Sequence, residues 1–120
     1  MNAFEVGQKV VELFRAGKHE EIMNDLYSPN IVSVEADGMK HEGMEGLKAK
    51  YQWWAENFEE HGSTVEGPYP HGGDEFILTF TMDTTHKPSG HRSQMTEAAH
   101  YKVENGKIVH EKFFYVQEGE

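Results

Sequence analysis

The sequence predicts an α+β fold in which helices cover one face of an antiparallel sheet. Apolar residues recur at helical spacing in the first half of the chain, and β-branched and aromatic residues alternate in the second half. Helices that come first, followed by strands joined by short turns, are typical of α+β proteins. At 120 residues the chain fits one domain, residues 1–120, with room for a single core.

We expect three helices. The first runs from Ala3 to about Arg15 and ends at Gly17, which suits a helix C-terminal cap. The second covers residues 19–27, because Pro29 disfavours helix at the residue before it. The third covers residues 44–61, where one stripe of apolar side chains recurs at the spacing of a helix that lies on a sheet. That stripe consists of Leu47, Tyr51, Trp54 and Phe58.

The remaining segments predict strands. A loop over residues 37–43 separates the first strand from the third helix, and the turns KPSG and ENG join the last three strands. The expected strands are residues 31–36, 63–67, 74–86, 91–103 and 107–117. In the third of these, the alternation places on one face Phe76, Leu78, Phe80 and Met82.

The turn between the last two strands allows two registers. A two-residue loop, Asn105-Gly106, pairs Glu104 with Lys107 and is the commonest hairpin for this dipeptide. A three-residue loop, with Gly106 in the left-handed conformation, pairs Val103 with Lys107 instead. Because a slip of one residue moves every side chain to the other face, the choice decides which residues meet the helices.

We choose the three-residue loop because it separates apolar from charged side chains more cleanly. It pairs Ala99 with Glu111, makes Glu97 and Glu111 diagonal neighbours beneath the helices, and makes His100 and His110 face each other on the outer surface. One face then collects Met95, Glu97, Ala99, Tyr101, Val103, Val109, Glu111, Phe113 and Tyr115. Burial of an ionised carboxylate is costly, so we expect Glu97 and Glu111 to share a proton and at least one pKa to be raised.

Composition restricts the partners. The chain has 21 acidic and 11 basic residues and a formal charge of -10, which argues against nucleic acids and anionic membranes. It has no cysteine, so disulfides and thiolate chemistry are excluded. The start MNAFEVGQKV lacks the features of a secretory signal, and no apolar run is long enough to span a bilayer. We therefore expect a cytoplasmic protein.

Several segments resemble the SnoaL-like branch of the nuclear transport factor 2-like superfamily. They are AGKHEEIMNDLYSPNIVSVEADG, HEGMEGLKAKYQWW, GHRSQMTEAAHY and NGKIVHEKFFY, and with the order of elements they extend the resemblance over almost the whole chain. The resemblance implies a cone-shaped α+β barrel of the cystatin-like type, a cavity between the helices and the concave sheet, and a homodimer formed through the convex face. The superfamily contains isomerases, cyclases, hydrolases and proteins that only bind ligands, so the fold alone does not choose an activity.

The resemblance to ketosteroid isomerase within this superfamily suggests roles for single residues. A base on the first strand after the second helix matches Glu35, while the position of its oxyanion-binding tyrosine is Val10 here. The position of its second acid is Ala99, two residues after Glu97 on the same face, and Glu111 falls on a pocket-lining position. The Asp-Arg-Asp set of the limonene epoxide hydrolase relatives has possible counterparts in Glu97, Arg92 and Glu111, but strand alternation places Arg92 on the opposite face.

The histidines and glycine-rich segments predict no metal or cofactor site. The chain has eight histidines but no helical His-Glu-x-x-His pair, and PHGGD is not followed by a phosphate-binding helix. We expect any chemistry to use protons, water and side chains alone.

Two functions fit the sequence. The first is a cofactor-independent isomerase, cyclase or hydrolase that acts on a small apolar molecule, with Glu35, Glu97 and Glu111 as its general acids and bases. The second is a non-catalytic module that binds a ligand or dimerises. In both cases we expect a pocket lined by Trp54, Phe80, Met95, Tyr101, Phe113 and Tyr115.

Overall fold

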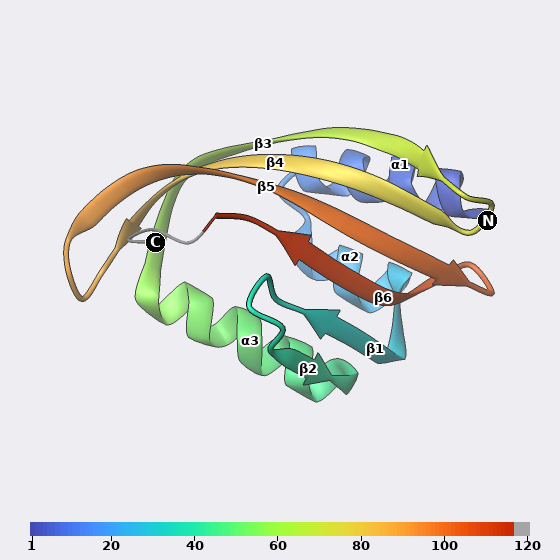
Figure 1. Ribbon diagram of the computed structural model, residues 1–120, viewed down its shortest axis with the longest axis horizontal. Coiled ribbons are helices and arrows are strands. Elements are labelled where there is room, and N and C mark those ends of the chain that lie inside the picture. The colour runs from blue at the N-terminus through green and yellow to red at the C-terminus, as the bar shows by residue number, and fades with distance from the viewer. Residues whose placement is uncertain (117–120) are drawn as a thin grey trace.

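The structure, a computed structural model, describes residues 1–116 and confirms the α+β class. The elements of this part of the chain are α1 (Ala3–Arg15), α2 (His19–Leu26), β1 (Tyr27–Val34), β2 (Lys40–Glu42), α3 (Gly43–Asn57), β3 (Phe58–His71), β4 (Glu75–His86), β5 (His91–Glu104) and β6 (Lys107–Phe114). Figure 1 shows the long strands β3, β4 and β5 arching over the helices. The last residue of the predicted strand 107–117 lies outside the described residues.

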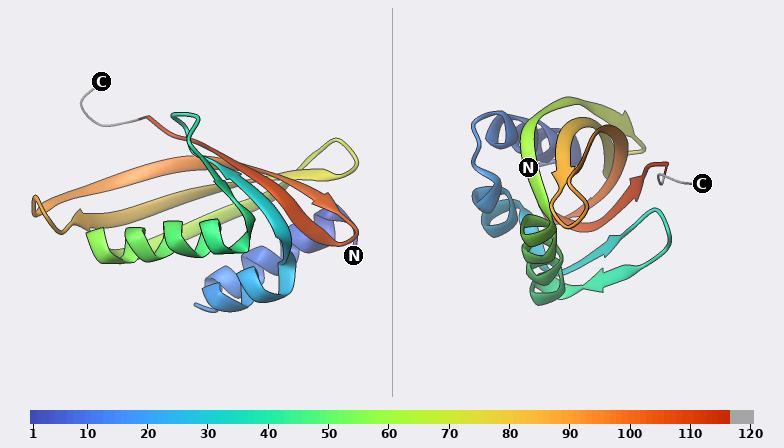
Figure 2. Two further views of the ribbon diagram at one scale, coloured as in Figure 1. Left: turned by 90° about the horizontal axis from the view of Figure 1, so that it is seen from below. Right: turned by 90° about the vertical axis from the view of Figure 1, so that its left-hand side faces the viewer.

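The sheet is cone-like, as the resemblance implies, and its two edges do not join to close a barrel. Its strand order is β2-β1-β6-β5-β4-β3, which leaves β2 and β3 at the edges of this sheet. Neighbouring strands are antiparallel except for β1 and β6, which pair in parallel and bring Ser33 opposite Glu111. The end-on view in Figure 2 shows how strongly the sheet curls. No helix within residues 1–116 is long and apolar enough to cross a membrane.

Helix α1 seals one half of the inner sheet face. A capping box begins it: the Asn2 side chain accepts from the Glu5 amide, and the Glu5 carboxylate accepts from the Asn2 amide. Its apolar face, including Val6 and Val10, is buried against β3 and β4. Gly7 allows the close approach, since a Cβ there would lie 2.7 Å from the Cβ of Pro68. On β4 the predicted inner residues Phe76, Leu78 and Phe80 are buried in this core.

Helix α3 is shorter than predicted, because strand pairing replaces its last turn. The prediction of helix to residue 61 is wrong: the helix ends at Asn57, and Phe58 already pairs with His86 of β4. The Lys87 amide donates to the Asn57 carbonyl at 2.7 Å and its ammonium group donates to the Ala55 carbonyl at 3.0 Å, so the β4–β5 turn fixes the helix end. Of the predicted stripe, only Leu47 is fully buried.

Two short segments near β1 also differ from the prediction. Tyr27, expected in the second helix, starts β1 and pairs with Ile108 of β6. Part of the expected loop 37–43 forms β2, which pairs with β1 from Val32 to Val34. Gly38, with φ of 91°, allows the tight turn between the two strands.

The β5–β6 register differs from the one that we chose, yet the side chains of β6 beyond Val109 point as predicted. Asn105 and Gly106 form the two-residue loop, with φ of 52° and 74°, and Glu104 pairs with Lys107. A bulge after Val103 and Ile108 then adds Val109, so that Tyr101 pairs with Glu111. The extra residue restores the alternation that the shorter loop would have reversed.

The observed register corrects four expectations. Ala99 pairs with Phe113 and not with Glu111. His100 pairs with Lys112, so it does not face His110 directly. Ile108, expected outside, is fully buried, whereas Val109 is only half-buried. Glu97 lies four residues from the partner of Glu111 and is therefore not its diagonal neighbour.

Candidate functional site

A group of polar side chains lies on the inner face of the sheet beneath α3. Glu111 and Ser33 are fully buried there and lie opposite each other on β6 and β1. Glu35 follows on the same face just after β1, and Glu97 lies on β5 opposite Phe80. The structure thus places Glu35, Glu97 and Glu111 on the side of the sheet that the sequence predicts. We call these three residues with Ser33 and Lys50 the inner cluster.

Glu111 is held by two hydroxyl donors. The Tyr27 hydroxyl donates to its Oε2 at 2.5 Å, and the Ser33 hydroxyl donates to its Oε1 at 2.8 Å. Burial raises the pKa of Glu111, while the charge of Lys50 and the two hydroxyl donors act in the opposite direction. Both oxygens of Glu111 accept from hydroxyl groups of β1, and among the described residues no hydrogen bond joins Glu111 to Glu97, so the expected pair that shares a proton is not formed.

Lys50 connects two of the glutamates. Its ammonium group lies 2.5 Å from Glu35 Oε1 and donates to the Ser33 hydroxyl at 3.1 Å, so one cation reaches Glu35 directly and Glu111 through Ser33. The contact with Glu35 is an ion pair without hydrogen-bond geometry, because that oxygen has no hydrogen-bond partner among the described residues. The other oxygen of Glu35 accepts from the Tyr115 hydroxyl at 3.1 Å.

Glu97 is the glutamate of the inner cluster that lacks a hydrogen-bond or ion-pair partner among the described residues. It is half-buried. Burial raises its pKa to about 7; Lys50 acts against this rise, and Glu35 and Glu111 add to it. Glu97 therefore changes protonation near neutral pH, which is the property required of a general acid and base.

Tyrosine hydroxyls surround the glutamates and stay protonated. Burial, followed by the charge of Glu111, raises the pKa of Tyr27, Tyr51 and Tyr101 well above the ordinary value. Tyr51 leaves 37% of its surface exposed, but burial and the charges of the three glutamates raise the pKa of its hydroxyl, so the hydroxyl end lies toward them. Burial and Glu35 raise the pKa of Tyr115 to about 12. These phenols can donate hydrogen bonds to an anion at neutral pH.

The apolar residues predicted to line a pocket divide into two groups. Phe80, Tyr101 and Phe113 are buried in the core, and Lys50 lies 4.1 Å from the centre of the Phe113 ring. Trp54, Met95 and Tyr115 are half-buried, as is Glu97. Strand β6 ends at Phe114, which pairs with Ala98, so Glu97 lies just beyond the part of β5 that pairs with β6.

Arg92 does not belong to the inner cluster. It lies on the outer face, as strand alternation predicts, with Nε 3.0 Å and a terminal guanidinium nitrogen 2.8 Å from the two carboxylate oxygens of Asp83. An Asp-Arg-Asp-like set with Glu97 and Glu111 is therefore not formed. The cation near the glutamates is Lys50, which sequence reasoning missed although it follows Leu47 by three residues on α3.

Open hollows lie on the surface of the described part of the molecule. The larger of two, about 650 Å³, runs along the outer face of β3, β4, β5 and the end of β6, where its lining includes Thr79, Thr96 and Phe114. The smaller, about 430 Å³, lies between the end of α1 and β3. Neither reaches Glu35 or Glu111. Glu97 belongs to the lining of the larger one, although strand alternation directs its side chain to the inner face.

The inner cluster can therefore exchange protons at Glu97 and stabilise negative charge nearby. A carboxyl group with a pKa of about 7 is present beside a lysine and several protonated phenols. Glu111, Ser33 and Tyr27 form the buried, hydrogen-bonded base of this arrangement. No step in this chemistry needs a cofactor.

Comparisons with known proteins place the chain in context. The SnoaL-like domain family matches residues 1–115. A candidate SnoaL-like polyketide cyclase from Mesorhizobium loti, whose name adds carbohydrate phosphatase in brackets, has a TM-score of 0.90 and 40% identity over 96% of this chain and 100% of its own. The comparison with curated proteins gave no match.

Two further solved structures show the same fold at low identity. An NTF2-like protein from Burkholderia thailandensis has a TM-score of 0.81 and 16% identity over 97% of this chain and 92% of its own. A candidate polyketide cyclase from Pseudomonas putida has a TM-score of 0.75 and 17% identity over the same shares of the two chains. At this identity the likeness supports the fold alone.

Proposed function

The chain belongs to the SnoaL-like domain family, and from this premise we propose that it is a cofactor-independent enzyme that transfers protons on a small apolar molecule. The observation that carries the proposal is Glu97, whose pKa is raised to about 7 and which has no hydrogen-bond or ion-pair partner among the described residues. A purely structural buried acid is normally satisfied by donors, as Glu111 is. Glu97 is instead free to act on a ligand.

The ligand that this arrangement suits is a small ketone or a related carbonyl compound with an apolar body. Phe80 lies opposite Glu97, and we propose that the half-buried Met95 and Trp54 line the same site. We propose that the apolar body packs against these side chains and that the carbonyl group points toward Lys50 and the Tyr51 hydroxyl. The carbon next to the carbonyl then faces the Glu97 carboxylate.

In the proposed reaction, the Glu97 carboxylate takes a proton from the carbon next to the carbonyl group. The electron pair of the broken C–H bond moves to the carbonyl oxygen and gives an enolate, which Lys50 and the Tyr51 hydroxyl stabilise. Glu97, now a neutral acid, returns the proton to carbon. Where a C=C bond is conjugated with the enolate, return of the proton to the far carbon of that bond gives an isomer. Attack of the enolate carbon on a second carbonyl group of the same molecule gives a ring, and the alkoxide that forms takes the proton from Glu97. Isomerase and cyclase chemistry therefore share the first step.

Hydrogen–deuterium exchange tests the proposed step without knowledge of the natural substrate. Aryl methyl ketones in D₂O would be followed by loss of the methyl proton signal in NMR. We expect the protein to accelerate exchange, with a rate that rises with pH through about 7, because the carboxylate is the active form. Glu97→Gln should lower the rate by at least about 100-fold, whereas Glu60→Gln, at an exposed position on β3, should not. Equal exchange rates for Glu97→Gln and the parent would contradict the proposal.

Lys50→Met provides a second readout. Because the Lys50 charge lowers the pKa of Glu97, its removal should move the midpoint of the pH–rate profile above that of the parent. Loss of enolate stabilisation should also lower the maximum rate. An unchanged midpoint would show that Lys50 does not act on Glu97 electrostatically.

The second candidate function, a non-catalytic binding or dimerising module, predicts a different result in the same experiment. The ketones would broaden or shift protein signals on binding, but the rate of exchange at carbon would equal that in buffer. The observation that favours this candidate is the satisfied state of Glu111, which fits a stabilising role equally well.

A further inference from the structure

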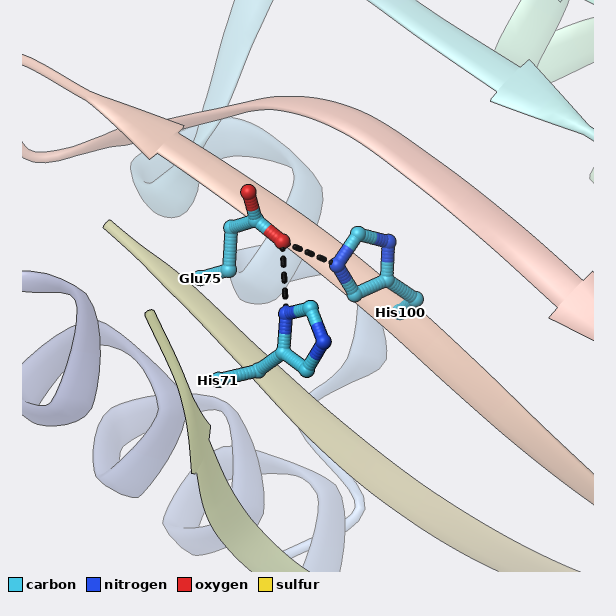
Figure 3. A group of neighbouring side chains, drawn as sticks. All are labelled: His71, Glu75 and His100. Carbon is cyan, nitrogen blue, oxygen red and sulfur yellow. Dashed lines mark hydrogen bonds and ion pairs between the residues drawn. The ribbon is translucent and has the colours of Figure 1, made fainter. Parts of the chain in front are cut away.

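Three potential metal ligands meet on the outer face of the sheet, away from the inner cluster. His71 is the last residue of β3 and pairs with Glu75, the first residue of β4. His100 lies on β5, diagonally opposite Glu75, whose direct partner is Lys102. Figure 3 shows the two imidazole rings converging on the Glu75 carboxylate. The β3–β4 hairpin and the β4–β5 pairing therefore bring together residues that are up to 29 positions apart in the sequence.

The distances in this outer cluster fit a small ion. His71 Nδ1 and His100 Nε2 lie 2.8 and 2.5 Å from the same oxygen of Glu75, and the three ligand atoms all lie within 4.8 Å of one another. A tetrahedral zinc ion with ligands at roughly 2.0–2.2 Å holds its ligand atoms about 3.4 Å apart. The ligands would thus have to shift by less than about 1 Å. His71, whose side chain is 56% exposed, is free to move by this amount.

The ligand chemistry also favours a divalent transition metal. Imidazole and carboxylate are the ligands that Zn²⁺ and Co²⁺ share, and the three side chains leave a fourth position open to water. In the metal-free protein each ring can direct an N–H at Glu75, and an ion would take the place of those two protons. Lys102 and Lys112, the strand partners of Glu75 and His100, oppose cation binding and limit the affinity.

We propose that His71, Glu75 and His100 form a binding site for a divalent transition-metal ion such as Zn²⁺. The ion would join the end of β3 to β4 and β5, and since β3 is an edge strand, it would hold that edge of the sheet in place. Because the outer cluster lies on the opposite face from Glu97, this site is independent of the proposed proton transfer.

Cobalt binding tests the site, since Co²⁺ takes the same ligands as Zn²⁺ and absorbs visible light. Full-length protein treated with a chelator would be titrated with Co²⁺ and then with Zn²⁺. We expect one equivalent of Co²⁺ to give the intense visible bands of a four-coordinate site and Zn²⁺ to abolish them. His71→Ala and His100→Ala should each weaken binding by at least about 10-fold. His61→Ala removes a histidine of β3 whose ring is hydrogen-bonded to the Thr85 hydroxyl, and it should leave the metal affinity unchanged.

A second measurement separates loss of the site from loss of the fold. Circular dichroism should show that the His71→Ala protein is folded, because His71 is an exposed side chain at the strand end. Saturating Zn²⁺ should raise the melting temperature of the parent by at least about 5 °C, but not that of His71→Ala. The proposal is overturned if Co²⁺ gives no four-coordinate spectrum, or if folded His71→Ala and His100→Ala proteins bind the metal as tightly as the parent.

Discussion

Replacing Glu97 by glutamine should make the protein more stable at neutral and alkaline pH. The pKa of Glu97 rises from 4.5 to about 7 on folding, so the folded state binds its proton more tightly than the unfolded state does. The stability that this proton provides is complete below pH 4.5 and is lost as the pH rises through about 7. Glutamine resembles the protonated acid and does not ionise, so the variant should not undergo this loss.

The magnitude follows from the size of the pKa change. Each pKa unit corresponds to about 1.36 kcal/mol, so ionised Glu97 costs the folded state about 3 kcal/mol. Glu97→Gln should therefore exceed the parent in free energy of unfolding by up to about 3 kcal/mol at about pH 8. At about pH 4.5 the two proteins should differ by much less.

Urea denaturation of the two proteins at several pH values between about 4.5 and 8 measures the difference. Glu60→Gln serves as the control, because Glu60 is exposed and its replacement should give the same difference from the parent at every pH. If the stability gain of Glu97→Gln is also independent of pH, Glu97 does not titrate as described and the electrostatic reasoning is refuted. If Glu97→Gln is more stable than the parent but no longer catalyses hydrogen–deuterium exchange on the ketones, Glu97 is retained for function at the expense of stability.

Three further predictions concern packing, hydrogen bonding and association. Gly7→Ala should destabilise the protein by about 1–3 kcal/mol despite the better helix propensity of alanine, because the new Cβ would lie 2.7 Å from Pro68. Gly46→Ala, where the nearest contact of the new Cβ is 3.5 Å, should stabilise the protein. Stabilisation by both substitutions would contradict the close packing at Gly7. Tyr27→Phe removes a hydrogen-bond donor to the buried Glu111 and should lower the free energy of unfolding, measured by urea denaturation, by about 1–3 kcal/mol. Tyr69→Phe, at an exposed position, should change it very little. Equal losses in the two variants would refute the role of the Tyr27 hydrogen bond. Light scattering should find a homodimer that Phe114→Glu, on the outer face, converts to monomer; a parent that is monomeric would contradict the homodimer.

Sequence patterns were sufficient for the elements whose periodicity is local. The alternation in β4 and the stripe of α1 each follow from side chains that neighbour one another on a single element, so the core around Val6, Phe76 and Leu78 was predictable. The end of α3 was not, because residues 58–61 have no helix breaker. Their strand conformation comes from pairing with β4, which is a contact distant in sequence.

The face of the glutamates was predicted correctly from a register that the structure does not have. Asn105-Gly106 forms the common two-residue loop, and the bulge at Val109 then restores the alternation. Hydrophobic segregation therefore identified the face of Glu111 but could not identify the pairing. Beyond the bulge the observed and chosen registers differ by two residues, so the side chains from His110 onward keep the predicted faces.

The hydrogen-bond and ion-pair partners of the glutamates could not be predicted from the sequence. Tyr27 and Ser33 reach Glu111 only because β1 pairs in parallel with β6, and Lys50 reaches Glu35 only because α3 packs on β1. The outer cluster was missed for the same reason: the spacing of His71, Glu75 and His100 matches no local metal motif, and the strand order alone brings them together.

The most direct test of the account is an NMR titration of the Glu97 side-chain carboxyl carbon in the full-length protein, assigned by comparison with Glu97→Gln. We predict that the Glu97 carboxyl titrates with a midpoint of about pH 7 and that Lys50→Met moves this midpoint to higher pH. A midpoint near the ordinary value of about 4.3 would show that Glu97 is ionised and solvated at neutral pH, and the proposed proton transfer would lose its basis.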